Sequence, residues 1–150
     1  MLSRQKVLLA IAILVMVGGA ASCNGSTPPA AQALAMAPMA QMPPVVQQAP
    51  VTVQQAYQFA VANPDLMKHV ACYCGCGKIG HKSNYDCYVS GVDSAGKVTF
   101  DQHALGCSIC VDITQDAMRQ LRQGKSMADI SSTIDTTFAK YGPSNMAPPQ

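Results

Sequence analysis

The sequence HVACYCGC at residues 69–76 is the most informative stretch of the chain, because it begins a window that contains nearly all the cysteines and histidines. Six of the seven cysteines and all three histidines lie between His69 and Cys110. Random placement would not gather them in this way. A small domain of about ninety residues, the length expected here, often needs cross-links or a metal ion to be stable. We therefore expect the fold to be built around these cysteines.

Within this window the cysteines and histidines form two dense groups. The first has the spacing His69-x2-Cys72-x-Cys74-x-Cys76, the second has His103-x3-Cys107-x2-Cys110, and His81 and Cys87 lie between them. If the first group is extended, side chains two apart point to the same side of the backbone, so its three thiols would line one face at intervals of about 6.6 Å. The second group lies at the predicted start of a helix, where free N–H groups and the helix dipole lower the pKa of a thiol.

Downstream of the cysteines the chain has helical periodicity. From Ser108, apolar residues at helical spacing predict a helix that ends at Gly124, a residue suited to a left-handed cap. A second helix is predicted from the capping-box-like pair Ser126 and Asp129 to Tyr141.

Upstream, residues 56–61 also recur at helical spacing, and the turn at Asn63-Pro64-Asp65 ends that helix or restarts it as a short segment. The middle of the domain, Cys72 to Phe100, is rich in Gly, Ser, Asn and Lys. Its turn at residues 93–96 would join two short strands, Cys87–Val92 and Lys97–Phe100. The sequence therefore predicts a mainly α fold: a small cysteine-rich helical domain with a loop-rich middle that could include one short β-hairpin.

Aromatic residues mark the limits of this domain, since all eight lie between Thr52 and Gly142. We expect one folded domain at residues 52–142. Residues 24–51 are mainly Ala, Pro, Gln, Met and Ser with no charge, a composition that buries too little surface to offset the entropy of ordering. We expect residues 23–51 to be a lipid-anchored disordered tether and residues 143–150 to be a disordered tail.

The N-terminus has the features of a cleaved export signal. Arg4 and Lys6 precede a run of apolar residues, Val7–Val17, that is shorter than the ~20 residues of a membrane-spanning helix. Small residues then lead to Cys23, in a pattern that resembles the lipobox of bacterial lipoproteins, with Ala20 where leucine is commonest. We expect residues 1–22 to be a signal peptide and Cys23 to carry lipid, with ordinary cleavage nearby as the alternative. The protein would then be exported and anchored to a membrane, facing the periplasm or the cell exterior.

The charge of the mature chain argues against nucleic acid as a partner. Of ten Lys and Arg residues, cleavage removes Arg4 and Lys6, which leaves eight against eight Asp and a net charge of zero. The expected partners are the membrane, through lipid on Cys23, a metal ion, and a metal-transfer or envelope protein.

The cysteine-rich segment resembles a known family. The run Ala71-Cys72-Tyr73-Cys74-Gly75-Cys76, together with the later His and Cys residues, is similar to uncharacterised prokaryotic lipoproteins defined by a Pro-Cys-Tyr-Cys-Gly-Cys motif. Ala71 replaces the proline of that motif. The resemblance covers about residues 52–142 and implies a lipoprotein with a functional cysteine motif, but no particular activity.

Our main hypothesis is that the domain binds a soft metal ion without catalysing a reaction. Thiolate and imidazole ligands select copper(I) and zinc over hard cations. Copper(I) is favoured because Met36, Met39 and Met42, three residues apart, would align their thioethers on one face of a polyproline helix. The implied role is capture, buffering or transfer of the ion. The candidate ligands are Cys72, Cys74, Cys76, Cys87, Cys107, Cys110, His103, His81 and His69.

Two other hypotheses remain open. Six cysteines in an exported domain could form three disulfides in a structural or interaction module, with 15 possible connectivities. Alternatively, Cys107-x2-Cys110 or Cys74-Gly75-Cys76 could carry out thiol–disulfide exchange, which is the one enzyme activity that we consider. The histidines favour the metal, since a disulfide framework has no use for imidazole.

Overall fold

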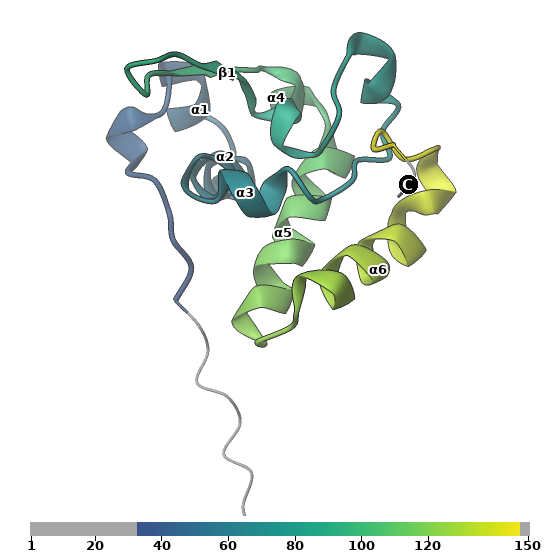
Figure 1. Ribbon diagram of the computed structural model, residues 1–150. Coiled ribbons are helices and arrows are strands. Elements are labelled where there is room, and N and C mark those ends of the chain that lie inside the picture. The colour runs from purple at the N-terminus through teal and green to yellow at the C-terminus, as the bar shows by residue number, and fades with distance from the viewer. Residues whose placement is uncertain (1–32, 148–150) are drawn as a thin grey trace, which may run out of the picture.

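The computed structural model describes residues 33–147, and helices dominate this part of the chain (Figure 1). The predictions of a signal peptide at residues 1–22 and of lipid on Cys23 lie outside the described residues. The elements are η1 (Met39–Gln41), α1 (Pro44–Gln47), α2 (Val51–Ala62), α3 (Pro64–Met67), η2 (Cys76–Ile79), η3 (Tyr85–Cys87), β1 (Val89–Val92), β2 (Val98–Phe100), α4 (His103–Gly106), α5 (Ser108–Arg122), α6 (Met127–Phe138) and η4 (Ala139–Tyr141), where η denotes a 3₁₀ helix. Among the described residues, no helix has the length and apolar character needed to span a membrane.

Helix α5 is the centre of the domain and packs against α2 and α6 (Figure 1). Its apolar face, which includes Ile113, Ala117 and Met118, is fully buried. The helix ends as predicted, because Gly124 adopts a left-handed conformation with φ of 73° and donates its N–H to the carbonyl of Leu121. The predicted mainly helical architecture is confirmed.

Helix α6 begins at the predicted cap. The hydroxyl of Ser126 accepts a hydrogen bond from the backbone N–H of Asp129 at 3.2 Å, which satisfies one of the free donors of the first turn. The stripe Ile130, Ile134 and Phe138 faces the core. Helix α6 thus closes one side of the domain.

The predicted hairpin is present and slightly shorter than expected. Strands β1 and β2 pair antiparallel, with an irregularity in register between Val89 and Gly91. In the turn, the Asp93 carboxylate accepts hydrogen bonds from the backbone N–H groups of Ala95 and Lys97, each at 2.9 Å. The first strand begins at Val89 instead of Cys87, because Cys87 ends the 3₁₀ turn η3.

The prediction that residues 23–51 form a disordered tether is wrong for residues 33–51. Ala37, Met42 and Val46 are buried in the core. Gln58 on α2 holds this segment, since the backbone N–H of Ala37 donates to the Gln58 carbonyl at 3.0 Å and the Gln58 amide donates to the Ala37 carbonyl at 2.7 Å. An uncharged segment can therefore be ordered when its few apolar side chains pack against a helix, here α2.

Because of this packing, Met36, Met39 and Met42 do not align on one face of a polyproline helix as expected. Met42 is buried, and Met36 and Met39 pack against the core as partly buried side chains. Their thioethers serve as core groups and do not form one exposed face. This takes away the sequence argument that favoured copper(I) over zinc.

The C-terminal tail is also ordered over residues 143–147. Its Asn145 exchanges two hydrogen bonds with Cys72: the backbone N–H of Cys72 donates to Oδ1 at 2.7 Å, and the N–H of Asn145 donates to the Cys72 carbonyl at 3.0 Å. The segment therefore lies beside the cysteine-bearing loop (Figure 1). Residues 148–150 lie outside the described part of the chain.

Candidate metal centre

All six cysteines of the domain converge in space. The sulfur atoms of Cys72 and Cys74 are 3.4 Å apart, and those of Cys76 and Cys87 are 3.7 Å apart. Cys110 lies at the centre, with its sulfur 3.5 Å from Cys72, 3.5 Å from Cys74 and 3.3 Å from Cys87. A disulfide would require about 2.05 Å. All six are free cysteines in the structure.

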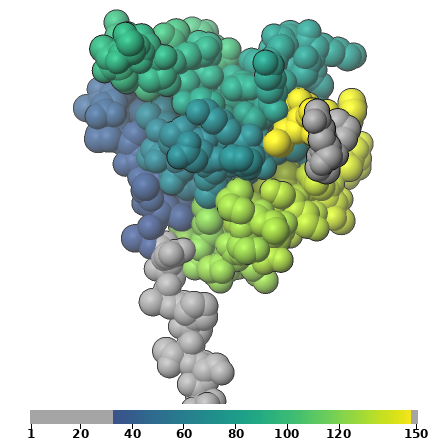
Figure 2. Space-filling view, in the orientation of Figure 1, coloured from purple at the N-terminus to yellow at the C-terminus, as the bar shows by residue number. Residues whose placement is uncertain are grey.

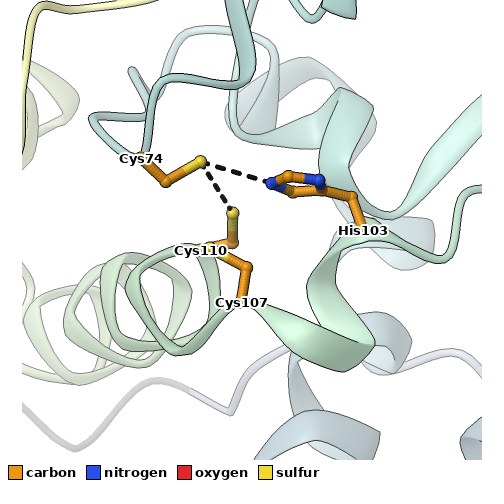
Figure 3. Close-up of side chains that lie close together, drawn as sticks. All are labelled: Cys74, His103, Cys107 and Cys110. Atoms are coloured by element: carbon orange, nitrogen blue, oxygen red, sulfur yellow. Dashed lines mark hydrogen bonds between the residues drawn. The ribbon is translucent and has the colours of Figure 1, made fainter.

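One candidate ligand group contains Cys74, His103, Cys107 and Cys110, whose donor atoms lie within 4.8 Å of one another. Figure 3 shows Cys74 from the loop facing His103 and the two cysteines at the start of α5. The Cys74 sulfur lies 3.4 Å from Nε2 of His103. We call this set the four-ligand group.

A second group contains Cys72, Cys76 and Cys87, again within 4.8 Å of one another. All three are buried. They come from the loop after α3 and from the 3₁₀ turns η2 and η3. We call this set the three-cysteine group.

The cysteine run does not lie extended with its thiols on one face, as the sequence had suggested. Gly75 adopts a left-handed conformation with φ of 85°, and the 3₁₀ helix η2 begins directly after it, at Cys76. With the backbone turned at Gly75, Cys74 belongs to the four-ligand group, while Cys72 and Cys76 belong to the other. Glycine is suited to this position because it lacks the Cβ that penalises positive φ.

Two short elements position the four-ligand group. Cys107 is the N-cap residue of α5 and Cys110 lies in its first turn, so a spacing of three places both thiols at the same helix end. Helix α4 immediately precedes them and carries His103. The backbone N–H of His103 donates to the Asp101 carboxylate at 2.7 Å, which fixes the start of this helix.

A buried polar network joins the cysteine loop to α5. Asn84 is fully buried; its backbone N–H donates to the Val70 carbonyl at 2.7 Å, and its amide oxygen accepts from the Thr114 hydroxyl at 3.0 Å. The Tyr88 hydroxyl donates to the Cys110 carbonyl at 2.8 Å. Because each polar group has a partner, the network holds the loop in one position relative to Cys110.

The three histidines have different positions. His103 belongs to the four-ligand group. Nδ1 of His81 lies 3.5 Å from the Cys87 sulfur, and its Nε2 lies 3.5 Å from the Asp101 carboxylate, so it borders the site without completing either group. His69 is exposed and its Nδ1 lies 2.6 Å from the Asp65 carbonyl. The structure therefore does not bring His69 to the cluster, because its side chain bonds to the preceding turn.

Asn145 is the residue at this site that sequence reasoning missed. Besides its two bonds to Cys72, its amide nitrogen lies 3.5 Å from the Cys76 sulfur and donates to the Ser83 carbonyl at 3.1 Å. No periodicity or motif marks an asparagine in a Pro-rich tail. A signal that could have been used is that a lone Asn after Gly142-Pro143 is a residue type that often satisfies backbone groups.

The thiols differ in their tendency to ionise. Contacts with the Cys110 and Cys87 thiols lower the pKa of Cys72. Burial, and next the charge at Cys72, raise the pKa of Cys74 and of Cys76. Contacts with Cys72 and Cys87, together with burial, raise the pKa of Cys110. At Cys110, the neighbouring thiols and burial therefore oppose the lowering of the pKa expected from the helix N-terminus.

The family model for proteins of unknown function with a PCYCGC motif matches residues 30–149 of this chain. The chain belongs to this family. The match extends beyond the cysteine window at both ends, in agreement with the packing of the segments before Val51 and after Gly142. Ala71, at the position of the motif's proline, is buried. No significant match was found among curated proteins or among solved structures.

The donor chemistry of the centre fits a soft metal ion. Six thiols and one imidazole nitrogen make up the two groups, and no carboxylate belongs to either. In a tetrahedral zinc site with metal–sulfur bonds of about 2.3 Å, neighbouring sulfur atoms lie about 3.8 Å apart. Within the groups, the sulfur atoms of Cys74 and Cys110 are 3.5 Å apart and those of Cys76 and Cys87 are 3.7 Å apart, close to that value. The Cys/His groups could therefore hold a metal ion.

Proposed function

We propose that this protein is an exported lipoprotein that binds a soft metal ion through its Cys/His centre, for capture, buffering or transfer. The observation that carries this proposal is the four-ligand group: three thiols and one imidazole within 4.8 Å of one another. Four such donors make up a complete tetrahedral ligand set. The export signal and the lipid on Cys23 belong to the proposal and rest on the sequence alone.

Copper(I) and zinc are the two candidate ions. Both prefer sulfur and imidazole nitrogen, whereas hard cations take oxygen ligands. We favour copper(I), because sulfur makes up six of the seven donors and thiolates are the softest ligands a protein offers. The packed methionines contribute nothing to this choice.

The position of Cys74 suggests how an ion reaches the site. Cys74 is partly exposed and lines a surface hollow together with Gly75, Lys78 and the segment 141–145. Cys107 is also partly exposed, on a hollow lined by α4 and residues 50–53. A partner protein could therefore offer or accept an ion at the four-ligand group without unfolding the domain.

The direct test is to purify the full chain in detergent and measure bound copper and zinc. Thiols are counted by alkylation and mass spectrometry before and after a chelator. The proposal predicts bound metal and thiols that become reactive only after chelation. Stable disulfides and no metal, even after reduction and reloading, would refute it. Cys23→Ser tests the anchor separately, because this variant should lose both the lipid mass and the membrane fraction.

Thiol–disulfide exchange is the second candidate, favoured by one specific observation. Cys107 and Cys110 lie at the N-terminus of α5 in a Cys-x2-Cys spacing, the placement that supports redox-active pairs in other folds. A single pair that cycles between oxidised and reduced forms, with reductase activity in metal-free protein, would support this function over metal binding.

A further inference from the structure

The three-cysteine group is one ligand short of a tetrahedral site. Cys72, Cys76 and Cys87 supply three buried thiols, whereas zinc in structural sites is almost always bound by four ligands. The position of the missing fourth ligand therefore decides what this group can bind.

Cys110 is placed to supply that ligand. Its sulfur lies 3.5 Å from Cys72 and 3.3 Å from Cys87, two of the three members of the three-cysteine group. It also lies 3.5 Å from Cys74 in its own group. Cys74, by comparison, contacts Cys72 of the other group. Cys74 and Cys87 each contact one thiol of the opposite group, whereas Cys110 contacts two thiols of the opposite group and also one of its own.

We propose that the centre can hold two four-coordinate d10 ions, such as zinc, that share the thiolate of Cys110. This inference rests on the proposed metal-binding function. The first ion is bound by Cys74, His103, Cys107 and Cys110, and the second by Cys72, Cys76, Cys87 and Cys110. Two four-coordinate ions need eight bonds, and seven donors supply eight bonds when one thiolate bridges. On binding, each thiol gives its proton to solvent, and no electron is transferred.

Two side chains at the edge of the three-cysteine group, His81 and Asn145, are placed to support its ligands. His81 approaches the Cys87 sulfur with Nδ1, while its Nε2 faces the Asp101 carboxylate. The amide of Asn145 points its nitrogen at Cys76, and an amide N–H donates a hydrogen bond to a thiolate instead of binding a cation. Both arrangements are typical of residues that orient and stabilise metal ligands from outside.

Cadmium, a d10 probe for thiolate sites, tests the shared ligand directly. The full chain is reduced, loaded with a spin-active cadmium isotope and examined by cadmium NMR, with the number of ions per chain measured by native mass spectrometry. The proposal predicts two ions per chain and two resonances split by coupling through the common sulfur. One ion per chain, or two resonances without mutual coupling, would overturn it. A chain that binds no ion at all would instead refute the proposed function.

Single-residue variants distinguish Cys110 from His81 as the fourth ligand of the second ion. Cys110→Ser should abolish the coupling and leave at most one tightly bound ion, whereas Cys76→Ser should remove the second ion and keep the first. His81→Gln should leave two coupled resonances. If His81→Gln loses the second ion while Cys110→Ser keeps it, the fourth ligand is His81 and the shared thiolate is refuted. The wild-type spectrum decides the question even if a variant fails to fold.

Discussion

The two ligand groups use the same chemistry in very different surroundings. In the four-ligand group, Cys74, His103 and Cys107 are partly exposed. In the three-cysteine group, Cys72 and Cys87 have no exposed surface and Cys76 has 2%. An ion in the first group would be accessible from the surface, whereas an ion in the second would be released only on local opening of the loop. We therefore expect a centre with one exchangeable position and one retained position.

The groups also differ in what they join. The four-ligand group connects the cysteine loop to α4 and α5, while the three-cysteine group ties the loop to itself and to the C-terminal segment through Asn145. In Figure 2, this C-terminal segment lies against the part of the surface formed by the cysteine loop. The first group links the loop to the helical core, and the second stabilises the loop internally.

The largest effect should follow removal of the metal. An ion that binds the folded state alone stabilises it by about 4 kcal/mol when present at a thousand times its Kd. We expect a chelator to lower the free energy of unfolding by about that amount for each ion, measured by urea titration with circular dichroism. Equal stability with and without chelator would contradict metal binding at both groups.

Thiol reactivity should separate the groups next. In metal-free protein, Cys74 and Cys107 should be alkylated at least about 100-fold faster than Cys72 and Cys87, because buried thiols react only after local opening. Peptide mass spectrometry after timed alkylation measures the rates. The unfolded chain in denaturant is the control, in which the rates should converge. Similar rates in the native protein would remove the proposed difference between the positions.

Replacing the histidine ligand should weaken only the exchangeable position. His103→Ala deletes one of four donors, and we expect the variant's affinity for the first ion to fall by about 10–100-fold or more. Losses of about 10–100-fold are typical even when the mutated residue only hydrogen-bonds to a metal ligand. Titration against a competing chelator of known affinity gives the value. His69→Ala is the matched control and should have no effect, because His69 lies outside both groups. Equal losses in the two variants would show that His103 is not a ligand.

The smallest effect is expected at the C-terminal segment. Asn145→Ala leaves the buried N–H of Cys72 without a partner, which should cost about 1–2 kcal/mol of stability and speed release of the retained ion. Asn63→Ala is the control, since the Asn63 amide also donates to two backbone carbonyls but lies at the end of α2. Stopped-flow release into a chelator compares the two. Identical release rates would mean that Asn145 stabilises the fold but does not slow release of the retained ion.

Much of the helical frame could be predicted because its signals are local. The apolar stripe and glycine end of α5, the Ser126 cap of α6 and the Asp93 turn each depend on residues a few positions apart. The N-terminal tether was predicted wrongly for the opposite reason. Whether Ala37 and Met42 are buried depends on α2, which follows them, and composition carries no information about that contact.

The candidate donors could be read from the sequence, since six thiols and three histidines lie in one window and residues of these types favour a soft metal ion over hard cations. Their division into two groups depends on folding, because the left-handed turn at Gly75 and the packing of the loop on α5 place neighbouring cysteines in different groups. The tertiary structure also placed Cys110 between the groups and added Asn145 from the far end of the chain. The physical reason is that a metal site is defined by distances of a few ångströms between side chains, and such distances depend on how the whole chain packs.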